Sequence, residues 1–158
     1  MTAAISRSGY DIDPLTEDRR EAFAARLSEE ERRVILDQGT EPAFCGTLLN
    51  NKSAGLYACR LCGLPLFRSE GKFESGTGWP SFTRPFDPEH VREIEDRAYG
   101  MVRTEIRCAR CDGHLGHVFP DGPPPTGLRY CLNSVSLEFF ESEEGIEQRT
   151  NSGTSDPS

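Results

Sequence analysis

Two C-x-x-C pairs constrain the fold of this chain more than any other feature of its sequence. The segments ACRLCG and RCARCDG contain Cys59 and Cys62 in the first pair and Cys108 and Cys111 in the second. Two intervening residues allow a tight turn to aim both sulfur atoms of a pair at one point. Two such turns supply the four thiolates of a tetrahedral zinc site. The pairs therefore predict one zinc ion per chain.

The predicted zinc site joins two distant segments, because residues 63–107 separate the pairs. The entropic cost of closing a loop grows only slowly with its length, so this separation is no obstacle. Gly63 and Gly113 each follow a pair and suit the expected turns. A thioredoxin-type redox pair is the alternative, but no βαβ pattern surrounds either pair. Four thiolates leave no position open for a substrate, so the zinc is expected to be structural.

Composition limits the compartment and the partners. The net charge of −8 argues against nucleic acid or an anionic membrane as the main partner, since both attract basic surfaces. No stretch approaches the roughly 18 apolar residues of a membrane helix, and the first residues lack the apolar run of a secretory signal. We therefore expect a cytoplasmic protein, and nothing in the sequence indicates an oligomer.

Local patterns predict an antiparallel β core preceded by short helices. TEDRREAFAARL is typical of a helix with Thr16 as N-cap, and SEEERRVILDQG predicts a second helix with a Ser28–Glu31 capping box and Gly39 at its end. After Gly46, MVRTEIRC and VSLEF alternate as strands do. DPEHVREIED is interpreted as a short helix. Residues 1–14 are expected to be a flexible arm and residues 141–158 a mobile polar tail.

Several side chains outside the zinc site are candidates for chemistry. In LRYCLNS, alternation puts Arg129, Cys131 and Asn133 on one face of a strand. A cation beside Cys131 would lower the pKa of its thiol and make it reactive, although a free cysteine is also commonly a small buried hydrophobe. In GHLGHVFPDG, a turn or bulge at the glycine would bring His114 and His117 to one site.

The remaining candidates are open to more than one interpretation. Trp79, in SGTGWPSF, is either a core plug, which the residues alone favour, or the wall of an apolar pocket. Cys45, in EPAFCGTLL, has no motif of its own and is either inert in a core or the partner of another thiol. His90 is interpreted as a surface residue.

Together these segments resemble the methionine-R-sulfoxide reductases of the B type, the SelR domain family. The resemblance runs from about residue 28 to residue 140 and rests on GTEPAF, GWPSF, GHLGHVFPDGP, PTGLRYCLNS and both C-x-x-C pairs, in that family's order. It implies a mainly β fold of two antiparallel sheets closed by the structural zinc. With it, residues 15–140 are expected to form the reductase domain.

The resemblance also implies the reaction. Cys131, as thiolate, attacks the sulfur of the R epimer of methionine sulfoxide, in free or protein-bound methionine, and becomes a sulfenic acid. The family pattern makes His114 and His117 the proton donors, and Asn133 and Arg129 arrange the site and tune the thiol. Trp79 packs against the terminal methyl group of the substrate, which replaces the plug interpretation.

Resolution of the sulfenic acid is where the sequence departs from its relatives. Many family members carry a resolving cysteine in GCGWPSF, whereas this chain has GTGWPSF with Thr77 at that position. The zinc site occupies four cysteines, so Cys45 is the candidate that forms a disulfide with Cys131, which thioredoxin then reduces. The alternative is direct reduction by an external thiol.

Three other classes fit parts of the sequence. A zinc-stabilised binding module would explain the C-x-x-C pairs but has no use for Cys131, Asn133 and the histidine pair. A zinc ribbon that binds nucleic acid conflicts with the net charge of −8. A thiol peroxidase would explain a reactive cysteine and its resolver, but it would explain neither Trp79 nor the histidines.

Overall fold

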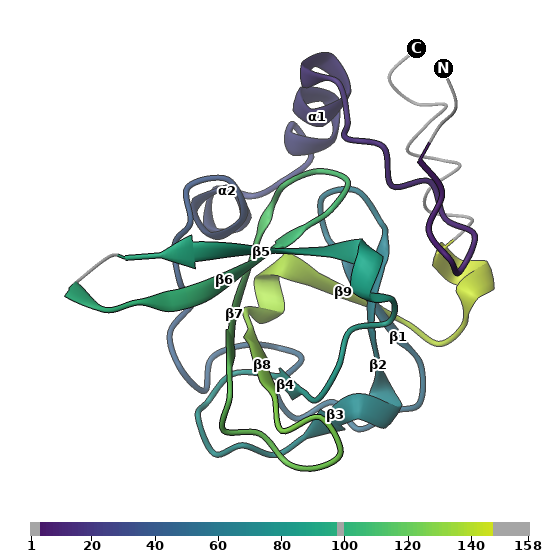
Figure 1. Ribbon diagram of the computed structural model, residues 1–158. Coiled ribbons are helices and arrows are strands. Elements are labelled where there is room, and N and C mark those ends of the chain that lie inside the picture. Colours follow the sequence, from purple (N-terminus) through teal and green to yellow (C-terminus); the bar gives the residue numbers. More distant parts are fainter. Residues whose placement is uncertain (1–3, 98–99, 147–158) are drawn as a thin grey trace.

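The computed structural model describes residues 4–97 and 100–146 of the chain (Figure 1). Two helices come first in the sequence, α1 (Glu17–Ala24) and α2 (Glu29–Ile35). The strands that follow are β1 (Leu56–Cys59), β2 (Pro65–Arg68), β3 (Lys72–Phe73), β4 (Ser81–Phe82), β5 (Val91–Asp96), β6 (Arg103–Cys108), β7 (His114–Phe119), β8 (Arg129–Leu132) and β9 (Leu137–Phe140). Single 3-10 turns cover Ser69–Gly71, Pro88–His90 and Ser134–Ser136.

The strands form two antiparallel sheets, as the resemblance implied. The smaller sheet has three strands in the order β2-β1-β9, and the larger has six in the order β3-β4-β8-β7-β6-β5. In Figure 1 the long β5–β6 hairpin lies at one edge of the larger sheet. Helix α2 packs against β7 and the 3-10 turn Ser134–Ser136. Among the described residues, no helix has both the length and the apolar character needed to cross a membrane.

Aromatic side chains join the two sheets. Tyr57 and Phe67 come from the smaller sheet, and Phe82 and Tyr130 from the larger. The ring centroids of Phe67 and Phe82 lie 4.7 Å apart, those of Tyr57 and Phe82 5.0 Å, and those of Phe67 and Tyr130 5.6 Å. Each such pair contributes about 0.5–1.5 kcal/mol beyond the burial of its area. This core fixes one face of β4 and β8 and leaves the other face available for a site.

Both predicted helices are present with their predicted N-caps. The side chain of Thr16 accepts a hydrogen bond from the backbone N–H of Arg19, and Ser28 and Glu31 form the full capping box. The end of α2 differs from the prediction, because Gln38 and not Gly39 takes the left-handed conformation, with φ 60°.

The expected helix over residues 87–96 is wrong. Only Pro88–His90 form a 3-10 turn, with Asp87 as the cap, and Val91–Asp96 form β5. Pairing with β6 along the full length of β5 outweighs the helical propensity of this charged segment. The strand expected over VSLEF likewise begins only at Leu137, after a 3-10 turn.

The interpretation of His90 as a surface residue is wrong. The predicted N-terminal arm covers this side chain and packs against the domain. His90 is fully buried, with Nδ1 2.6 Å from the carbonyl oxygen of Pro65 and Nε2 2.8 Å from Oγ of Ser6. Ser8 donates from its hydroxyl to Asp87 at 2.8 Å. The described part of the predicted arm therefore contacts the domain, because it supplies hydrogen bonds to buried polar groups.

The beginning of the predicted tail is also packed. Residues 143–146 are helical, and Ile146 is 1% exposed in a small cluster with Leu56 and Ala58. One buried isoleucine in an otherwise polar segment carries too weak a signal to predict this contact. The rest of the expected tail, residues 147–158, lies outside the described residues.

Candidate functional site

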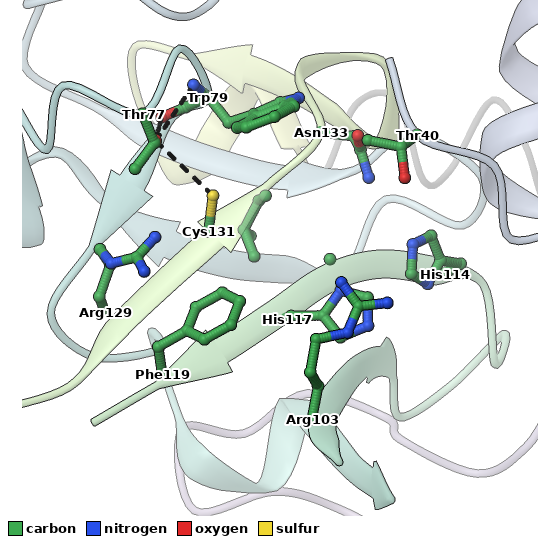
Figure 2. A pocket seen from close by; sticks show the side chains of 12 residues that line it. Thr40, Thr77, Trp79, Arg103, His114, His117, Phe119, Arg129, Cys131 and Asn133 are labelled. Atoms are coloured by element: carbon green, nitrogen blue, oxygen red, sulfur yellow. Dashed lines mark hydrogen bonds between the residues drawn. The ribbon is translucent and has the colours of Figure 1, made fainter. Parts of the chain in front are cut away.

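A cavity of about 310 Å³ borders strands β7 and β8. Its lining residues are Thr40, Thr77, Trp79, Arg103, His114, Gly116, His117, Phe119, Arg129, Cys131, Leu132 and Asn133 (Figure 2). The structure thus brings together the side chains of Cys131, both histidines and Trp79 in one place, with Asn133 and Arg129 of the predicted set. Cys45 is exposed and does not line this cavity.

Cys131 lies on β8, whose side chains alternate between the core and the cavity. Tyr130 and Leu132 are buried in the core, whereas Arg129 and Cys131 are partly exposed and line the cavity. This is the alternation that LRYCLNS predicts. On the neighbouring strand β7, His117 is paired with Cys131. Side chains of directly paired residues project from the same face of a sheet, so the imidazole stands beside the thiol.

Gly116 allows β7 to lie close to β8. A Cβ atom at this position would overlap the carbonyl oxygen of Cys131 and lie 2.9 Å from Cα of Leu132. Any side chain at Gly116 would push β7 away from the strand that carries the thiol. This close approach explains why a glycine stands in GHLGHVF.

Burial raises the pKa of the Cys131 thiol, and its polar neighbours act in the opposite direction. The hydroxyl of Thr77 lies 3.8 Å from Sγ and, with the guanidinium of Arg129, favours the thiolate. Arg129 is itself held by Asp121 through hydrogen bonds of 2.9 and 3.2 Å, and its guanidinium lies over the ring of Phe119. Burial outweighs the effect of Arg129 and Thr77, so the net pKa of Cys131 is raised.

A β-bulge brings the two histidines to one side of β7. The pairing of β6 with β7 shifts register between Ile106 and Arg107. His114 and His117 both line the cavity, and their ring centroids lie 5.7 Å apart. The predicted bulge is confirmed.

His114 belongs to a buried chain of charged groups. Its Nδ1 lies 2.7 Å from Oε2 of Glu105, and Arg107 donates to both carboxylate oxygens of Glu105 at 2.9 and 3.1 Å. Burial lowers the pKa of His114, although the carboxylate of Glu105 acts to raise it. The pKa of Glu105 is lowered because the hydrogen bonds from Arg107 and His114 outweigh its burial. The sequence placed Glu105 on the polar face of its strand and gave no sign of this role.

His117 has a carboxylate partner of its own. Its Nε2 lies 2.8 Å from Oδ2 of Asp96, which also accepts a hydrogen bond from Arg103 at 3.1 Å. Asp96 and Arg103 face each other in the β5–β6 hairpin. Sequence reasoning missed Asp96 because it assigned this segment to a helix. A strand assignment for VREIED, paired with RTEIRC, would have found it.

Trp79 and Asn133 are held by the segment that precedes Cys45. The indole N–H of Trp79 donates to the carbonyl oxygen of Glu41 at 2.9 Å, and the backbone N–H of Glu41 donates to Oδ1 of Asn133 at 3.0 Å. The amide of Asn133 donates to the carbonyl oxygen of Leu115 at 3.1 Å. Trp79 is half-buried at the cavity, as a pocket wall and not as a core plug.

Thr77 stands next to Cys131, at the position where the resemblance expects a cysteine. Its hydroxyl also lies 2.8 Å from Oγ of Ser75. Cys45 reaches this region from a neighbouring loop, because the N–H of Phe44 donates to the carbonyl oxygen of Gly78 at 2.7 Å. Cys45 does not line the cavity, so its sulfur must move toward Cys131 before the two can bond.

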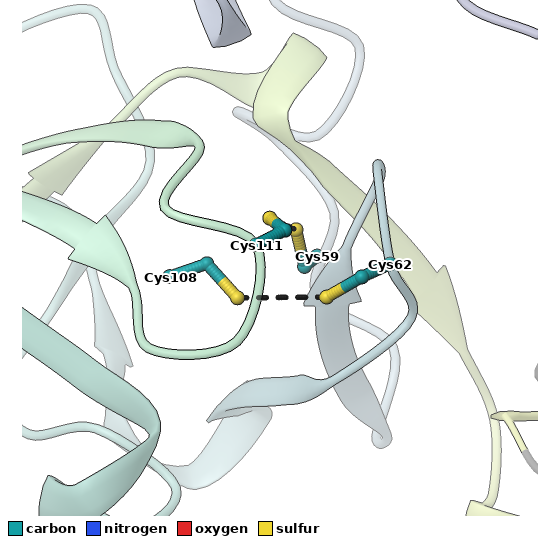
Figure 3. Close-up of side chains that lie close together, drawn as sticks. All are labelled: Cys59, Cys62, Cys108 and Cys111. Atoms are coloured by element: carbon teal, nitrogen blue, oxygen red, sulfur yellow. Dashed lines mark hydrogen bonds between the residues drawn. The ribbon is translucent and has the colours of Figure 1, made fainter. Parts of the chain in front are cut away.

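The four paired cysteines meet at the ends of two hairpins, one from each sheet (Figure 3). Cys59 and Cys62 flank the turn between β1 and β2, and Cys108 and Cys111 flank the turn between β6 and β7. All four sulfur atoms are buried and lie within 4.8 Å of one another. In the second turn Asp112 has the left-handed conformation, with φ 62°.

The cysteine cluster has the geometry of a metal site. The sulfur atoms of Cys59 and Cys111, and those of Cys62 and Cys108, lie 3.5 Å apart. A tetrahedral ion with metal–sulfur bonds of about 2.3 Å needs sulfur atoms about 3.8 Å apart, which this cluster nearly matches. These four cysteines could therefore hold a metal ion with no position left open.

The comparisons with known proteins agree with this geometry. A sequence model of the SelR domain matches residues 27–141. The chain is 63% identical over 139 residues to "Peptide methionine sulfoxide reductase MsrB" of Caulobacter vibrioides (strain NA1000 / CB15N), across 88% of this chain and 87% of that protein. Proteins of the same description from Xylella fastidiosa (strain M23) and Synechococcus sp. (strain RCC307) are 60% identical over 131 residues and 55% identical over 128 residues.

The alignments with those two relatives cover 83% and 81% of this chain, and 84% and 94% of the relatives. The domain match and the relatives thus extend over nearly all of the sheets, the cavity and the cysteine cluster. The chain belongs to the SelR domain family.

Proposed function

We infer that this chain reduces the R epimer of methionine sulfoxide to methionine, in free or protein-bound methionine, with Cys131 as the nucleophile. Family membership makes the chain a methionine sulfoxide reductase, which is an oxidoreductase. The observation that supports Cys131 most strongly is its pairing with His117 inside a cavity walled by Trp79. A nucleophile, an acid and an apolar wall are the three parts that this reaction needs.

In the reductive step, Cys131 and the sulfoxide exchange two electrons and one oxygen. The thiolate of Cys131 attacks the sulfoxide sulfur while a histidine protonates the oxygen, which is otherwise a poor leaving group. The protonated oxygen then leaves the substrate sulfur and bonds to the Cys131 sulfur as the bond between the two sulfur atoms breaks. Methionine leaves with its sulfur reduced, and Cys131 carries the oxygen as a sulfenic acid. His117 faces Cys131 directly and His114 stands behind it, so both are suited to supply protons.

The handed cavity supports a preference for one epimer. Histidine nitrogens lie on one side of Cys131, and the ring of Trp79 lies on the other (Figure 2). In the R epimer, the oxygen faces the donors and the methyl group packs on the indole. Inverting the sulfur exchanges these two groups, which leaves the oxygen without donors and the methyl group without its apolar wall.

Cys45 resolves the sulfenic acid. Its thiolate attacks the Cys131 sulfur, a sulfur–sulfur bond forms, and the oxygen leaves as water. Thioredoxin, a dithiol, then exchanges with this disulfide and restores both thiols. Thr77 supports this assignment, because the position nearest the nucleophile carries a hydroxyl that cannot form a disulfide. The exposed position of Cys45 also makes the disulfide accessible to a reductant.

Zinc is the metal that the four-cysteine cluster holds. Thiolates favour zinc, and a closed tetrahedral site is typical of a structural ion. Cys59, Cys62, Cys108 and Cys111 join the two sheets through it, and none of them lines the cavity. A monomeric cytoplasmic protein, with no nucleic acid or membrane partner, agrees with the net charge of −8.

One assay tests the reaction most directly. The purified protein is supplied with thioredoxin, its reductase and NADPH, together with either the R or the S epimer of a methionine sulfoxide substrate. We expect repeated turnover of the R epimer and none of the S epimer. Activity on the S epimer alone, or on neither, would reject the proposal.

A variant tests the resolving step separately. Cys45→Ser is expected to release stoichiometric methionine from the R epimer and then stall when thioredoxin is the reductant. Unchanged repeated turnover in this variant would show that an external thiol reduces Cys131 directly.

A further inference from the structure

Glu41 has no part in the reaction described above, yet it joins several parts of the site. This carboxylate is 2% exposed. Its Oε2 accepts the backbone N–H of Ser134 at 2.8 Å, and its Oε1 accepts that of Val135 at 3.0 Å. The backbone of Glu41 accepts from the indole of Trp79 and donates to Asn133. One residue therefore ties the pocket wall to the turn that follows the nucleophile strand.

The Cys45 loop comprises residues 42–45. It follows Glu41 directly in the sequence, and Gly46, the residue after the loop, lies against the side chain of Glu41. Gly46 packs so tightly that a Cβ atom there would overlap both the carboxylate of Glu41 and Oγ of Ser134. The next contact is the N–H of Leu48, which donates to Oγ of Ser134 at 3.3 Å. Both ends of the loop are thus held at one place.

The tip of the Cys45 loop is exposed, although Ala43 and Phe44 pack against Gly78. Phe44 is 69% exposed and has a φ of 66°, which is costly for a bulky residue. Its hydrogen bond to Gly78 rests the loop on the backbone beside Trp79. A segment with fixed ends, an exposed tip and a strained residue is suited to swing without disturbing its base.

We propose that Glu41 is a positioning residue that holds both the Trp79 wall and the base of the Cys45 loop. The loop part of this inference rests on the resolving role proposed for Cys45. In that step the thiolate of Cys45 displaces the oxygen of the Cys131 sulfenic acid as water and forms the disulfide. A short tether with fixed ends keeps the effective concentration of Cys45 at Cys131 high, whereas a loosened base lowers it.

The carboxylate of Glu41 is required because both of its partners are donors. An amide of the same shape would present its NH₂ group to one of the two backbone N–H groups and lose that hydrogen bond. Glu41→Gln therefore changes the hydrogen bonds that hold the base of the Cys45 loop, with little change in side-chain volume. Glu30→Gln is the matched control, since Glu30 pairs with Arg33 on the exposed side of α2.

The experiment follows one turnover of the R epimer without a reductant. Methionine release is measured against substrate concentration, and disulfide formation is timed by acid quench and mass analysis. For Glu41→Gln we expect the half-saturating concentration to rise and the disulfide rate to fall, each by about tenfold, with stoichiometric methionine at saturation. Glu30→Gln should match the wild type in all three.

A second variant separates the two roles proposed for Glu41, which are to hold the Trp79 wall and to hold the base of the Cys45 loop. Ser134→Ala removes the hydroxyl that holds Leu48 but keeps the backbone N–H bonded to Glu41. It should slow disulfide formation and leave the half-saturating concentration unchanged. A Ser134→Ala disulfide rate equal to or above that of the wild type would overturn the loop part of the proposal.

The remaining outcomes are also decisive. If Glu41→Gln matches Glu30→Gln, the carboxylate positions neither the wall nor the loop. If it loses only the amount of methionine released at saturation, Glu41 merely maintains the fold. Either result overturns the proposal. If the wild type forms no disulfide between Cys45 and Cys131, the resolving role itself fails. The substrate dependence of Glu41→Gln then still supports or rejects its effect on the Trp79 wall.

Discussion

The six cysteines of this chain form two groups that differ in burial and in the groups that surround their sulfur atoms. The first group is fully enclosed, its sulfur atoms lie within 4.8 Å of one another, and it consists of Cys59, Cys62, Cys108 and Cys111. The second group is Cys131, at the cavity, and Cys45, exposed on a loop. The polar side chains nearest Cys131 are the hydroxyl of Thr77 and the guanidinium of Arg129.

This difference shows that position, and not residue type, decides what a cysteine does. Hairpin turns fix the first group in a closed set of ligands, which suits a permanent ion. Strand β8 presents Cys131 to histidines and to Trp79, which suits a transient bond. The loop of Cys45 leaves room for movement. The predictions below separate the two groups, from the largest expected effect to the smallest.

The largest effect is expected from the metal group. Cys108→Ser should remove the zinc and with it most of the stability, because structural zinc contributes on the order of 10 kcal/mol in small domains and a domain's total is only about 5–15 kcal/mol. Circular dichroism on heating and zinc analysis would measure this. Cys45→Ser is the control and should retain both the wild-type melting temperature and the zinc. A Cys108→Ser protein with an unchanged melting temperature would refute the structural role.

The next effect is expected from Cys131, whose replacement should lower the activity and leave the stability unchanged. Cys131→Ser should lower turnover of the R epimer by more than about a thousandfold, since a hydroxyl cannot replace the thiolate. Its melting temperature should stay close to that of the wild type because serine fits the partly exposed position. Coupled turnover and thermal unfolding of the same preparation would test this pair of outcomes. Residual repeated turnover would point to another nucleophile.

A smaller effect is expected from Arg129. Burial raises the pKa of Cys131 and Arg129 acts against it, so Arg129→Gln should raise this pKa further. Because the thiolate is the reactive form, alkylation of Cys131 at neutral pH should slow several-fold, and its pH profile should move to higher pH. Iodoacetamide labelling of Cys131, followed by mass spectrometry, would measure the profile. A profile that stays in place or moves to lower pH would contradict the assigned role of Arg129.

The smallest effect lies away from both cysteine groups, at His90. Burial lowers the pKa of His90 from its ordinary value of 6.5. Below about pH 6.5 the unfolded chain takes up a proton that the folded chain refuses, so the stability that His90 contributes is lost as the pH falls. His90→Gln should flatten this decline in part, because the pKa of His114 is lowered as well. Urea unfolding of the wild type and of His90→Gln across this pH range would measure the effect. If His90 were accessible to solvent, the free energy of unfolding of the two proteins would decline equally as the pH falls.

The sequence predicts best where a local pattern determines the outcome. The alternation of LRYCLNS fixes which side of β8 carries Cys131, and the C-x-x-C spacing fixes two sulfur atoms in each turn. The capping box of α2 also depends only on residues three apart. Each of these features needs no knowledge of the rest of the fold.

The partners of the site could not be predicted, because they depend on pairing between distant segments. Asp96 reaches His117 only when β5 pairs with β6 in the observed register. Glu105 is buried on a face that its sequence marks as polar, because His114 and Arg107 satisfy its carboxylate. Glu41 is an ordinary acidic residue in the sequence, and only the fold places its carboxylate beneath the turn after β8.

The role proposed for Cys45 depends on both the sequence and the structure. The missing cysteine at position 77 and the predicted use of four thiols as zinc ligands nominate Cys45 from the sequence. The structure places it outside the cavity, on a loop hydrogen-bonded to the backbone beside Trp79. The resolving role proposed for Cys45 therefore requires its sulfur to move toward Cys131 in each turnover.

The most direct test of this division is a map of all six cysteines after one turnover. The reduced protein is mixed with the R epimer without a reductant, free thiols are alkylated under native conditions, and the digest is analysed by mass spectrometry. We predict one disulfide, between Cys45 and Cys131, with the zinc content unchanged. An alkylated Cys45 after turnover, or a disulfide that involves any of the four zinc cysteines, would contradict the account.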